Sequence, residues 1–132
     1  MPLPLKISCA VSQREARAAA RIDSPYVVRC LDSGTWHGRH FLVMEYVEGV
    51  NLAEKIKVGY RFTVHEALQI ACQAGRALWA AAKLGMVHRD IKPANMMIDT
   101  QGHVKLMDFG LVRTLRDASS LTQLTQTGVV MG

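Results

Sequence analysis

The feature that most constrains the fold is the stretch from Thr63 to Gly85, which reads TVHEALQIACQAGRALWAAAKLG. Thr63 and Glu66 have the spacing of a capping box, and Gly85 can end a helix in the left-handed conformation. Apolar residues recur at helical spacing along one face, at Ala67, Ile70, Ala71, Ala74, Leu78 and Ala81. The polar side chains among them exclude a membrane span. The stretch therefore predicts a long amphipathic helix over 63–84.

The first part of the chain predicts a helix followed by a pair of strands. The Ala/Arg-rich stretch that contains Ser12 and Glu15 has a second capping-box spacing. Two stretches rich in β-branched and aromatic residues, YVVRCL (26–31) and HFLVMEYV (40–47), flank the turn-like DSGTWHGR. This pattern favours two antiparallel strands joined by residues 32–39.

The segments around the long helix predict further short elements. NLAEKIK (51–57) is typical of a short helix that Asn51 caps. NMMID (95–99) and HVKLMD (103–108) surround TQG and predict a tight β-hairpin. The last stretch, 111–132, is polar and without clear period, as expected of a mobile loop. The fold class is therefore α+β.

Composition limits the class of protein. With 132 residues and 49% hydrophobic content, the chain is one small domain or a piece of a larger one. The formal charge of +5 comes from scattered Lys and Arg, and aromatic residues are few, so we expect no nucleic-acid partner. We expect no membrane segment, because the chain has no long apolar run and no signal peptide. The three cysteines form no CxxC motif, which indicates reduced thiols and a cytoplasmic protein.

The stretch MVHRDIKPANMMID, between the long helix and the hairpin, concentrates hydrogen-bonding side chains on a loop held by two regular elements. It matches the pattern H-R-D-x-x-x-x-N, and Asp108-Phe109-Gly110 follows at the end of the hairpin. In this order, the two motifs resemble those of the protein kinases. Lys92, two residues after Asp90, is similar to the serine/threonine branch. The resemblance implies an incomplete protein-kinase-like fold: part of the N-lobe sheet with the family's C helix, the hinge, the D and E helices, the catalytic loop and the hairpin.

The resemblance assigns a chemical role to each polar residue of the two motifs. Asp90 would orient the acceptor hydroxyl and take its proton. Lys92 would neutralise charge on the transferred γ-phosphate. The amide oxygen of Asn95 and the carboxylate of Asp108 would bind Mg²⁺, which prefers hard oxygen ligands. His88 is expected to pack against its neighbours rather than react.

The stretch FLVMEYVEG resembles the strand and hinge that line the adenine pocket of kinases. Met44 would be the gatekeeper, and the backbone of Glu45 and Val47 would bind the base. Asn51 would lie near the ribose, although the helix cap alone also explains an asparagine there, and one residue can do both.

Two methionines of the hairpin, Met97 and Met107, would contact the adenine from below. Taken without the resemblance, they are more typical of core methionines.

The resemblance covers nearly the whole chain, which in turn covers about half of a kinase domain. Residues 1–46 would be a remnant of the N-lobe, 47–107 the hinge and the start of the C-lobe, and 108–132 the start of the activation segment. No G-x-G-x-x-G precedes the first helix, and no A-P-E follows. Glu15 takes the position of the family's helix glutamate, with Lys6 as its candidate strand lysine or with the capping box as the alternative explanation.

The implied function is transfer of the γ-phosphate of ATP to a serine or threonine hydroxyl of a protein substrate, with Mg²⁺. An inert kinase fragment that binds a nucleotide or a partner remains the alternative. Intact Asp90, Asn95 and Asp108 favour the enzyme, whereas the missing motifs favour the inert fragment, and we expect no kinase activity from these 132 residues alone.

Regulation by phosphorylation is expected in the last segment. Thr125 and Thr127 resemble the paired threonines that bacterial kinases autophosphorylate. A phosphate there would pair with Arg89, assisted by Arg113 or Arg116.

Overall fold

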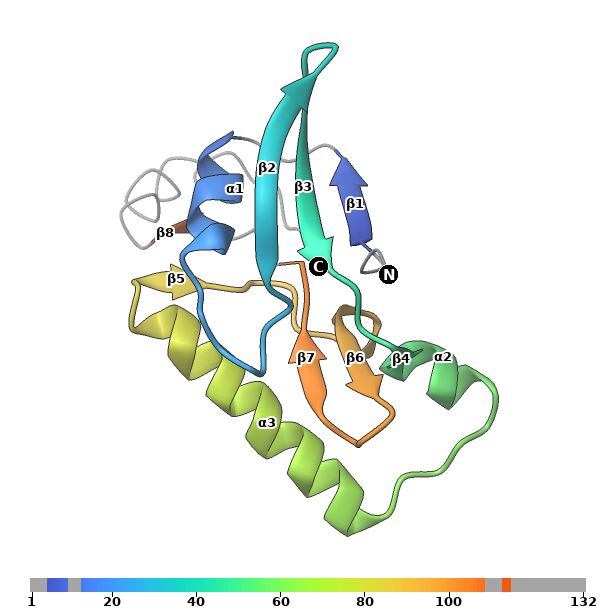
Figure 1. Ribbon diagram of the computed structural model, residues 1–132. Coiled ribbons are helices and arrows are strands. Elements are labelled where there is room, and N and C mark those ends of the chain that lie inside the picture. The colour runs from blue at the N-terminus through green and yellow to red at the C-terminus, as the bar shows by residue number, and fades with distance from the viewer. Residues whose placement is uncertain (1–4, 10–12, 109–112, 115–132) are drawn as a thin grey trace, which may run out of the picture.

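The computed structural model describes residues 5–9, 13–108 and 113–114. Figure 1 shows two small antiparallel sheets, one above the other, with helix α1 (Gln13–Ala20) beside the upper sheet and the long helix α3 (Val64–Ala82) beneath the lower one. The mixed helix and strand content confirms the α+β prediction. The expected first and long helices are both present.

The upper sheet contains three antiparallel strands in the order β1-β3-β2. The central strand β3 (Arg39–Glu45) pairs with β1 (Leu5–Cys9) on one side and with β2 (Cys30–Trp36) on the other. β3 ends at Glu45, from which the chain descends to the lower sheet (Figure 1).

The predicted strand pair is correct in its partners but wrong in its bounds. β2 begins at Cys30 and continues to Trp36, through residues that were expected to form the turn. The turn is shorter than expected, because His37 and Gly38 both take positive φ, at 48° and 74°. Two residues of this kind suffice to reverse a twisted hairpin.

Residues 26–28, which were expected to begin the strand, lie outside β2, and the backbone of Tyr26 and Val28 bonds to β7 instead. The Leu106 amide donates to the Tyr26 carbonyl at 2.8 Å, and the Val28 amide donates to the Leu106 carbonyl at 2.9 Å. Val27 between them forms a parallel bridge with Leu106. This segment therefore belongs to the lower sheet by its hydrogen bonds, although it precedes β2 in the chain.

The lower sheet has the order β4-β6-β7, formed by Gly49–Asn51, Met96–Asp99 and Val104–Leu106. β6 and β7 form the predicted hairpin, in which Met96 faces Leu106. The carboxylate of Asp99 closes the turn by accepting from the amides of Gln101 and His103, both at 2.8 Å.

The helix ends follow the local signals in the sequence. Asn51 caps α2 (Leu52–Lys57) by accepting from the Ala53 amide at 2.8 Å. Thr63 and Glu66 form the predicted capping box at the start of α3, and Gly85 follows the helix with a φ of 72°. The capping interaction predicted for Ser12 lies outside the described residues.

Most of the predicted apolar face of α3 packs in the core, because Ala74 and Ala81 are buried and the half-buried Ile70 and Leu78 pack against the same cluster. Ala74, Ala77 and Ala81 are buried, whereas Ala67 and Ala71 are exposed. The prediction is wrong only at Ala67 and Ala71, near the start of the helix. The buried alanines all lie in its second half.

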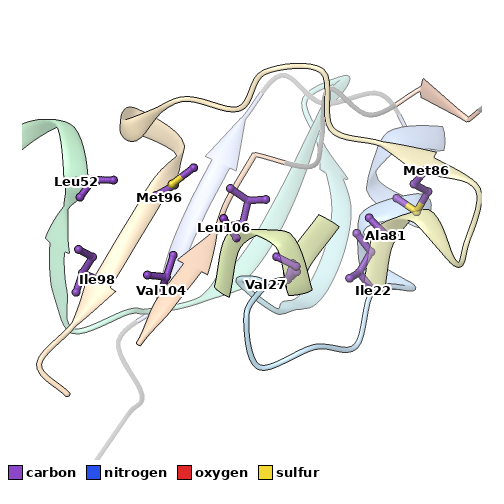
Figure 2. Close-up of a cluster of buried hydrophobic side chains, with 11 residues drawn as sticks. Ile22, Val27, Leu52, Ala81, Met86, Met96, Ile98, Val104 and Leu106 are labelled. Carbon is purple, nitrogen blue, oxygen red and sulfur yellow. The ribbon is translucent and has the colours of Figure 1, made fainter. Parts of the chain in front are cut away.

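A single apolar cluster joins α3, the lower sheet and the segment after α1 (Figure 2). Figure 2 shows Val104 and Leu106 of β7 in its middle, with Ile22 and Val27 beside Ala81. Ile22 and Val27 thus pack with the lower layer, although they belong to the range 1–46 that was expected to form an N-lobe remnant. The proposed division of the chain at 46 and 107 stays a prediction.

Two short strands form a third pair, one directly after α3 and one at the last described residues. β5 (Met86–Val87) pairs with β8 (Arg113–Thr114). The rest of the expected mobile loop, including Thr125 and Thr127, lies outside the described residues. Within the part of the chain that the structure describes, no helix is long and apolar enough to cross a membrane.

Candidate active site

The loop after β5 is anchored by a buried histidine. His88 is 1% exposed, and its Nε2 lies 2.8 Å from the carbonyl oxygen of Met107. Its Nδ1 accepts from the Asp90 amide at 3.1 Å, so Nε2 carries the proton and donates to Met107. His88 thus fixes the loop to the end of β7 and has a packing role, as the sequence predicted.

Asp90 lies between a cation and an amide. Its Oδ2 is 3.2 Å from Lys92 Nζ and accepts from Asn95 Nδ2 at 3.2 Å. The ion pair with Lys92 and, to a smaller extent, the hydrogen bond from Asn95 lower the pKa of Asp90 below its ordinary value. Asp90 is therefore a carboxylate at neutral pH, which a proton acceptor requires.

Asn95 connects the loop to the hairpin. It is buried at the end of the 3₁₀ turn Pro93–Asn95, and its Nδ2 also donates to the Asp90 carbonyl at 2.8 Å. Because the amide nitrogen is held by Asp90, the amide oxygen points away from that carboxylate. The Asn95 carbonyl accepts from the Met107 amide at 2.9 Å, which brings the residue after Met107 to the same end of the hairpin.

That residue is Asp108, the second candidate magnesium ligand. It is half-buried and has a φ of 63°, and Arg89 on the opposite loop has a φ of 69°. Non-glycine residues adopt this conformation at an energetic cost, and such strain concentrates at functional sites. An amide oxygen and a carboxylate are donors that fit Mg²⁺. Sequence reasoning predicted both ligands but not the strained backbone, for which the sequence carries no signal.

The candidate adenine contacts lie at the junction of the two sheets. Met44 and Met107 are buried, so a core role is observed for these two, whereas Met97 is half-buried. Contact with a base stays a prediction for all three. The Glu45 amide donates to the Arg29 carbonyl at 2.9 Å and is therefore not available to a base.

Asn51 is held in two directions. Besides capping α2, it donates through Nδ2 to the Ala94 carbonyl at 2.5 Å, which links α2 to the 3₁₀ turn before the hairpin. The cap explanation is thus observed, and the ribose contact stays a prediction. Val47 lies between β3 and β4, and its backbone contact with the base stays a prediction.

The structure tests neither the predicted Lys6–Glu15 pair nor the two arginines that were expected to assist Arg89. Lys6 lies in β1, where it faces Met44, and Glu15 lies in α1, but their side chains lie outside the described set. Arg113 lies in β8, and Arg116 falls beyond the described residues.

Sequence reasoning missed one polar contact of this region. Lys105 Nζ lies 2.6 Å from Glu45 Oε1, which joins the hairpin to the end of β3. The two residues are 60 positions apart, so no local pattern indicates the pair.

Comparison with known proteins identifies the family. A family described as Protein kinase domain matches residues 6–131. The probable serine/threonine-protein kinase pknA2 of Bifidobacterium longum is 42% identical over 91% of this chain and 15% of its own length. The serine/threonine-protein kinase PrkC of Bacillus subtilis is 40% identical, again over 91% of this chain and over 18% of its own length. PknL of Mycobacterium tuberculosis is 43% identical over 89% of this chain and 29% of its own length.

The chain thus spans less than a third of the length of these relatives. The match nevertheless extends from the first strand to the end of the sequence and includes the loop and hairpin described above. The chain therefore belongs to the protein kinase domain family.

Proposed function

We propose that the protein transfers the γ-phosphate of ATP to a serine or threonine hydroxyl of a protein substrate. The observation that carries the proposal is the arrangement of Asp90, Lys92 and Asn95, which the Asn95–Met107 backbone bond joins to Asp108. A carboxylate that is ionised at neutral pH, a nearby cation and a pair of oxygen ligands are the parts that phosphoryl transfer requires.

Each side chain has a distinct role in this proposal. Asp90 orients the acceptor hydroxyl and takes its proton, and its ionisation is favoured by Lys92 and Asn95. Lys92 is half-exposed, so its ammonium group can turn toward an incoming phosphate. Asn95 and Asp108 would hold Mg²⁺ through their side-chain oxygens, and the ion would supply positive charge that stabilises the phosphates during transfer.

The base of ATP would bind where the two sheets meet. We place the adenine beside Met44, Met97 and Met107, with backbone contacts at Val47 and at the carbonyl of Glu45, whose amide already bonds to Arg29. Asn51 is half-buried at the start of α2 and would contact the ribose from there. The apolar surfaces of the methionines suit a flat heterocycle, and their flexible side chains adapt to its shape.

The test is transfer of labelled γ-phosphate from ATP to a generic protein acceptor by the full-length protein. Asp90→Asn removes the proton acceptor, and Asp108→Ala removes a magnesium ligand, so each should lower the rate by orders of magnitude. Asp23→Asn is the matched control, because Asp23 is exposed and lies beside Arg29, outside the proposed machinery. Near-normal transfer by either of the first two variants would contradict the roles assigned.

A measurement of ATP binding by the same protein separates the enzyme from an inert nucleotide-binding fragment. If the wild-type protein binds ATP but transfers no phosphate, the inert alternative is correct. If it binds no ATP in the presence of Mg²⁺, the enzyme and the nucleotide-binding form of the alternative are both wrong, and only the partner-binding form is left.

A further inference from the structure

The ion pair between Glu45 and Lys105 differs from the other described ion pairs in its position and burial. The Lys105 side chain is 20% exposed and that of Glu45 28%, whereas both side chains of the Lys92–Asp90 pair are more exposed. Glu45 is the last residue of β3 in the upper sheet, and Lys105 is the middle residue of β7 in the lower one. The pair therefore connects the two sheets.

The carboxylate of Glu45 also binds a third segment. Its Oε1 accepts from the Arg29 amide at 2.9 Å, while the Glu45 amide donates to the Arg29 carbonyl at 2.9 Å. The backbone just before β2 is thus tied to the end of β3, and Lys105 ties both to the hairpin. Three segments that are distant in sequence meet at one side chain.

These contacts lie between the two halves of the proposed nucleotide site. The base would bind beside Glu45, and the phosphates beside Asn95 and Asp108. Lys105 faces Met97 across the hairpin and precedes Asp108 by only a few residues. Neither side chain of the pair is needed to touch ATP, but together they set how far apart the two halves are held.

We infer that Lys105 is a positioning residue, which through the Glu45 carboxylate holds the base-binding end of β3 at the spacing that ATP requires from Asn95 and Asp108. This inference rests on the proposed function. ATP contacts both halves at once, whereas adenosine contacts only the base and ribose half. Loss of the pair should therefore weaken ATP binding more than adenosine binding, because only ATP depends on the spacing.

The experiment compares the affinities of the full-length protein for ATP with Mg²⁺ and for adenosine, measured by titration calorimetry. Lys105→Met keeps most of the aliphatic stem and removes the charge. We expect it to weaken ATP binding about fivefold, the upper end of what a partly exposed pair contributes, and adenosine binding less than about twofold. Lys105→Arg restores a cation and should recover ATP affinity to within about twofold of wild type.

Two further variants make the result specific. Glu45→Gln keeps an oxygen for the Arg29 amide but loses the charge that attracts Lys105, so it should reproduce the selective loss of ATP affinity. Lys83→Met is the matched control, because Lys83 is an exposed lysine that follows α3. It should leave both affinities unchanged.

A second measurement tests the contacts of Glu45 with Lys105 and Arg29 in the absence of any nucleotide. Hydrogen exchange of the Arg29 and Glu45 amides should be faster in Lys105→Met than in wild type, because both amides are bonded within the tied segment. Equal loss of ATP and adenosine affinity, no loss, or tighter ATP binding in Lys105→Met would each overturn the positioning role. If wild-type protein binds neither ligand, the proposed function fails, and the exchange rates still show whether Lys105 ties the sheets.

Discussion

Replacement of Leu106 by alanine should be among the most destabilising single changes in the described part of the chain. Leu106 is fully buried in β7, opposite Met96 and bridged by Val27. Removal of about three carbon atoms, at about 0.8 kcal/mol each, gives a transfer cost of about 2.4 kcal/mol. Neighbours that cannot relax into the space add a cavity term.

The surroundings of Leu106 favour a large cavity term. Its amide and carbonyl both bond to the segment around Val27, at 2.8 and 2.9 Å, which holds that segment in place. We therefore expect Leu106→Ala to lower the free energy of unfolding by about 3–4 kcal/mol, within the measured range for buried leucines. That loss is a large part of the roughly 5–15 kcal/mol that stabilises a typical domain.

The assay is equilibrium unfolding of the full-length protein in urea, followed by circular dichroism. Leu31→Ala is the matched control, because the Leu31 side chain in β2 is 48% exposed and should cost less than about 1 kcal/mol. A loss below about 1 kcal/mol for Leu106→Ala, or a loss equal to that of the control, would refute the view that β7 is the centre of the core.

Three further predictions concern charge and regulation. Lys92→Met removes the main cause of the lowered pKa of Asp90, so carboxyl resonances followed by NMR should show Asp90 titrating at higher pH than in wild type; an unchanged titration would exclude the pair in solution. Burial raises the pKa of Asp99, but hydrogen bonds within its turn outweigh burial and lower it below the ordinary value of 3.8. The ionised carboxylate therefore contributes its full stabilisation above pH 3.8, and this contribution is lost as the pH falls through the lower pKa of the folded state. Asp99→Asn should therefore flatten the acid side of the stability profile in urea titrations at several pH values, and a profile as steep as that of wild type would contradict this. Mass spectrometry after incubation with ATP should find phosphate on Thr125 or Thr127, and a double alanine variant that is unphosphorylated yet fully active would show that these threonines are not the switch.

The sequence predicted those parts of the fold whose contacts are local. The capping box of Thr63 and Glu66, the Asn51 cap, the end of α3 at Gly85 and the β6–β7 hairpin each depend on residues a few positions apart. Such signals are complete within a short stretch of chain, so they can be read without knowledge of the rest.

The errors concern contacts between distant segments. Residues 26–28 have a good strand composition, but they bond to Leu106 rather than to β3. On α3, Ala67 and Ala71 belong to the predicted apolar face but are exposed, because only the later part of that face packs against the core cluster. Tertiary contacts of this kind outweigh local preference and leave no short-range pattern.

The site was predicted in its residue types but not in its connections. The motifs indicated Asp90, Lys92, Asn95 and Asp108 through the resemblance to kinases. The sequence did not show that Asn95 holds Asp90 through its side chain and Met107 through its backbone. These connections depend on the register between the loop and the hairpin, which only the folded chain establishes.

The attachment of residues 26–28 to β7 has a mechanical consequence for the β2–β3 hairpin. The chain leaves the lower sheet after Val28 and returns to it after Glu45, and the two crossings are bonded to each other through Arg29 (Figure 1). A unit that one flexible segment connects to the rest of a protein can rotate in any direction. A unit that two adjacent segments connect rotates mainly about the axis that passes through both. We therefore expect the upper hairpin to move about this axis more easily than it twists sideways, because sideways twisting would have to break the bonds at Arg29.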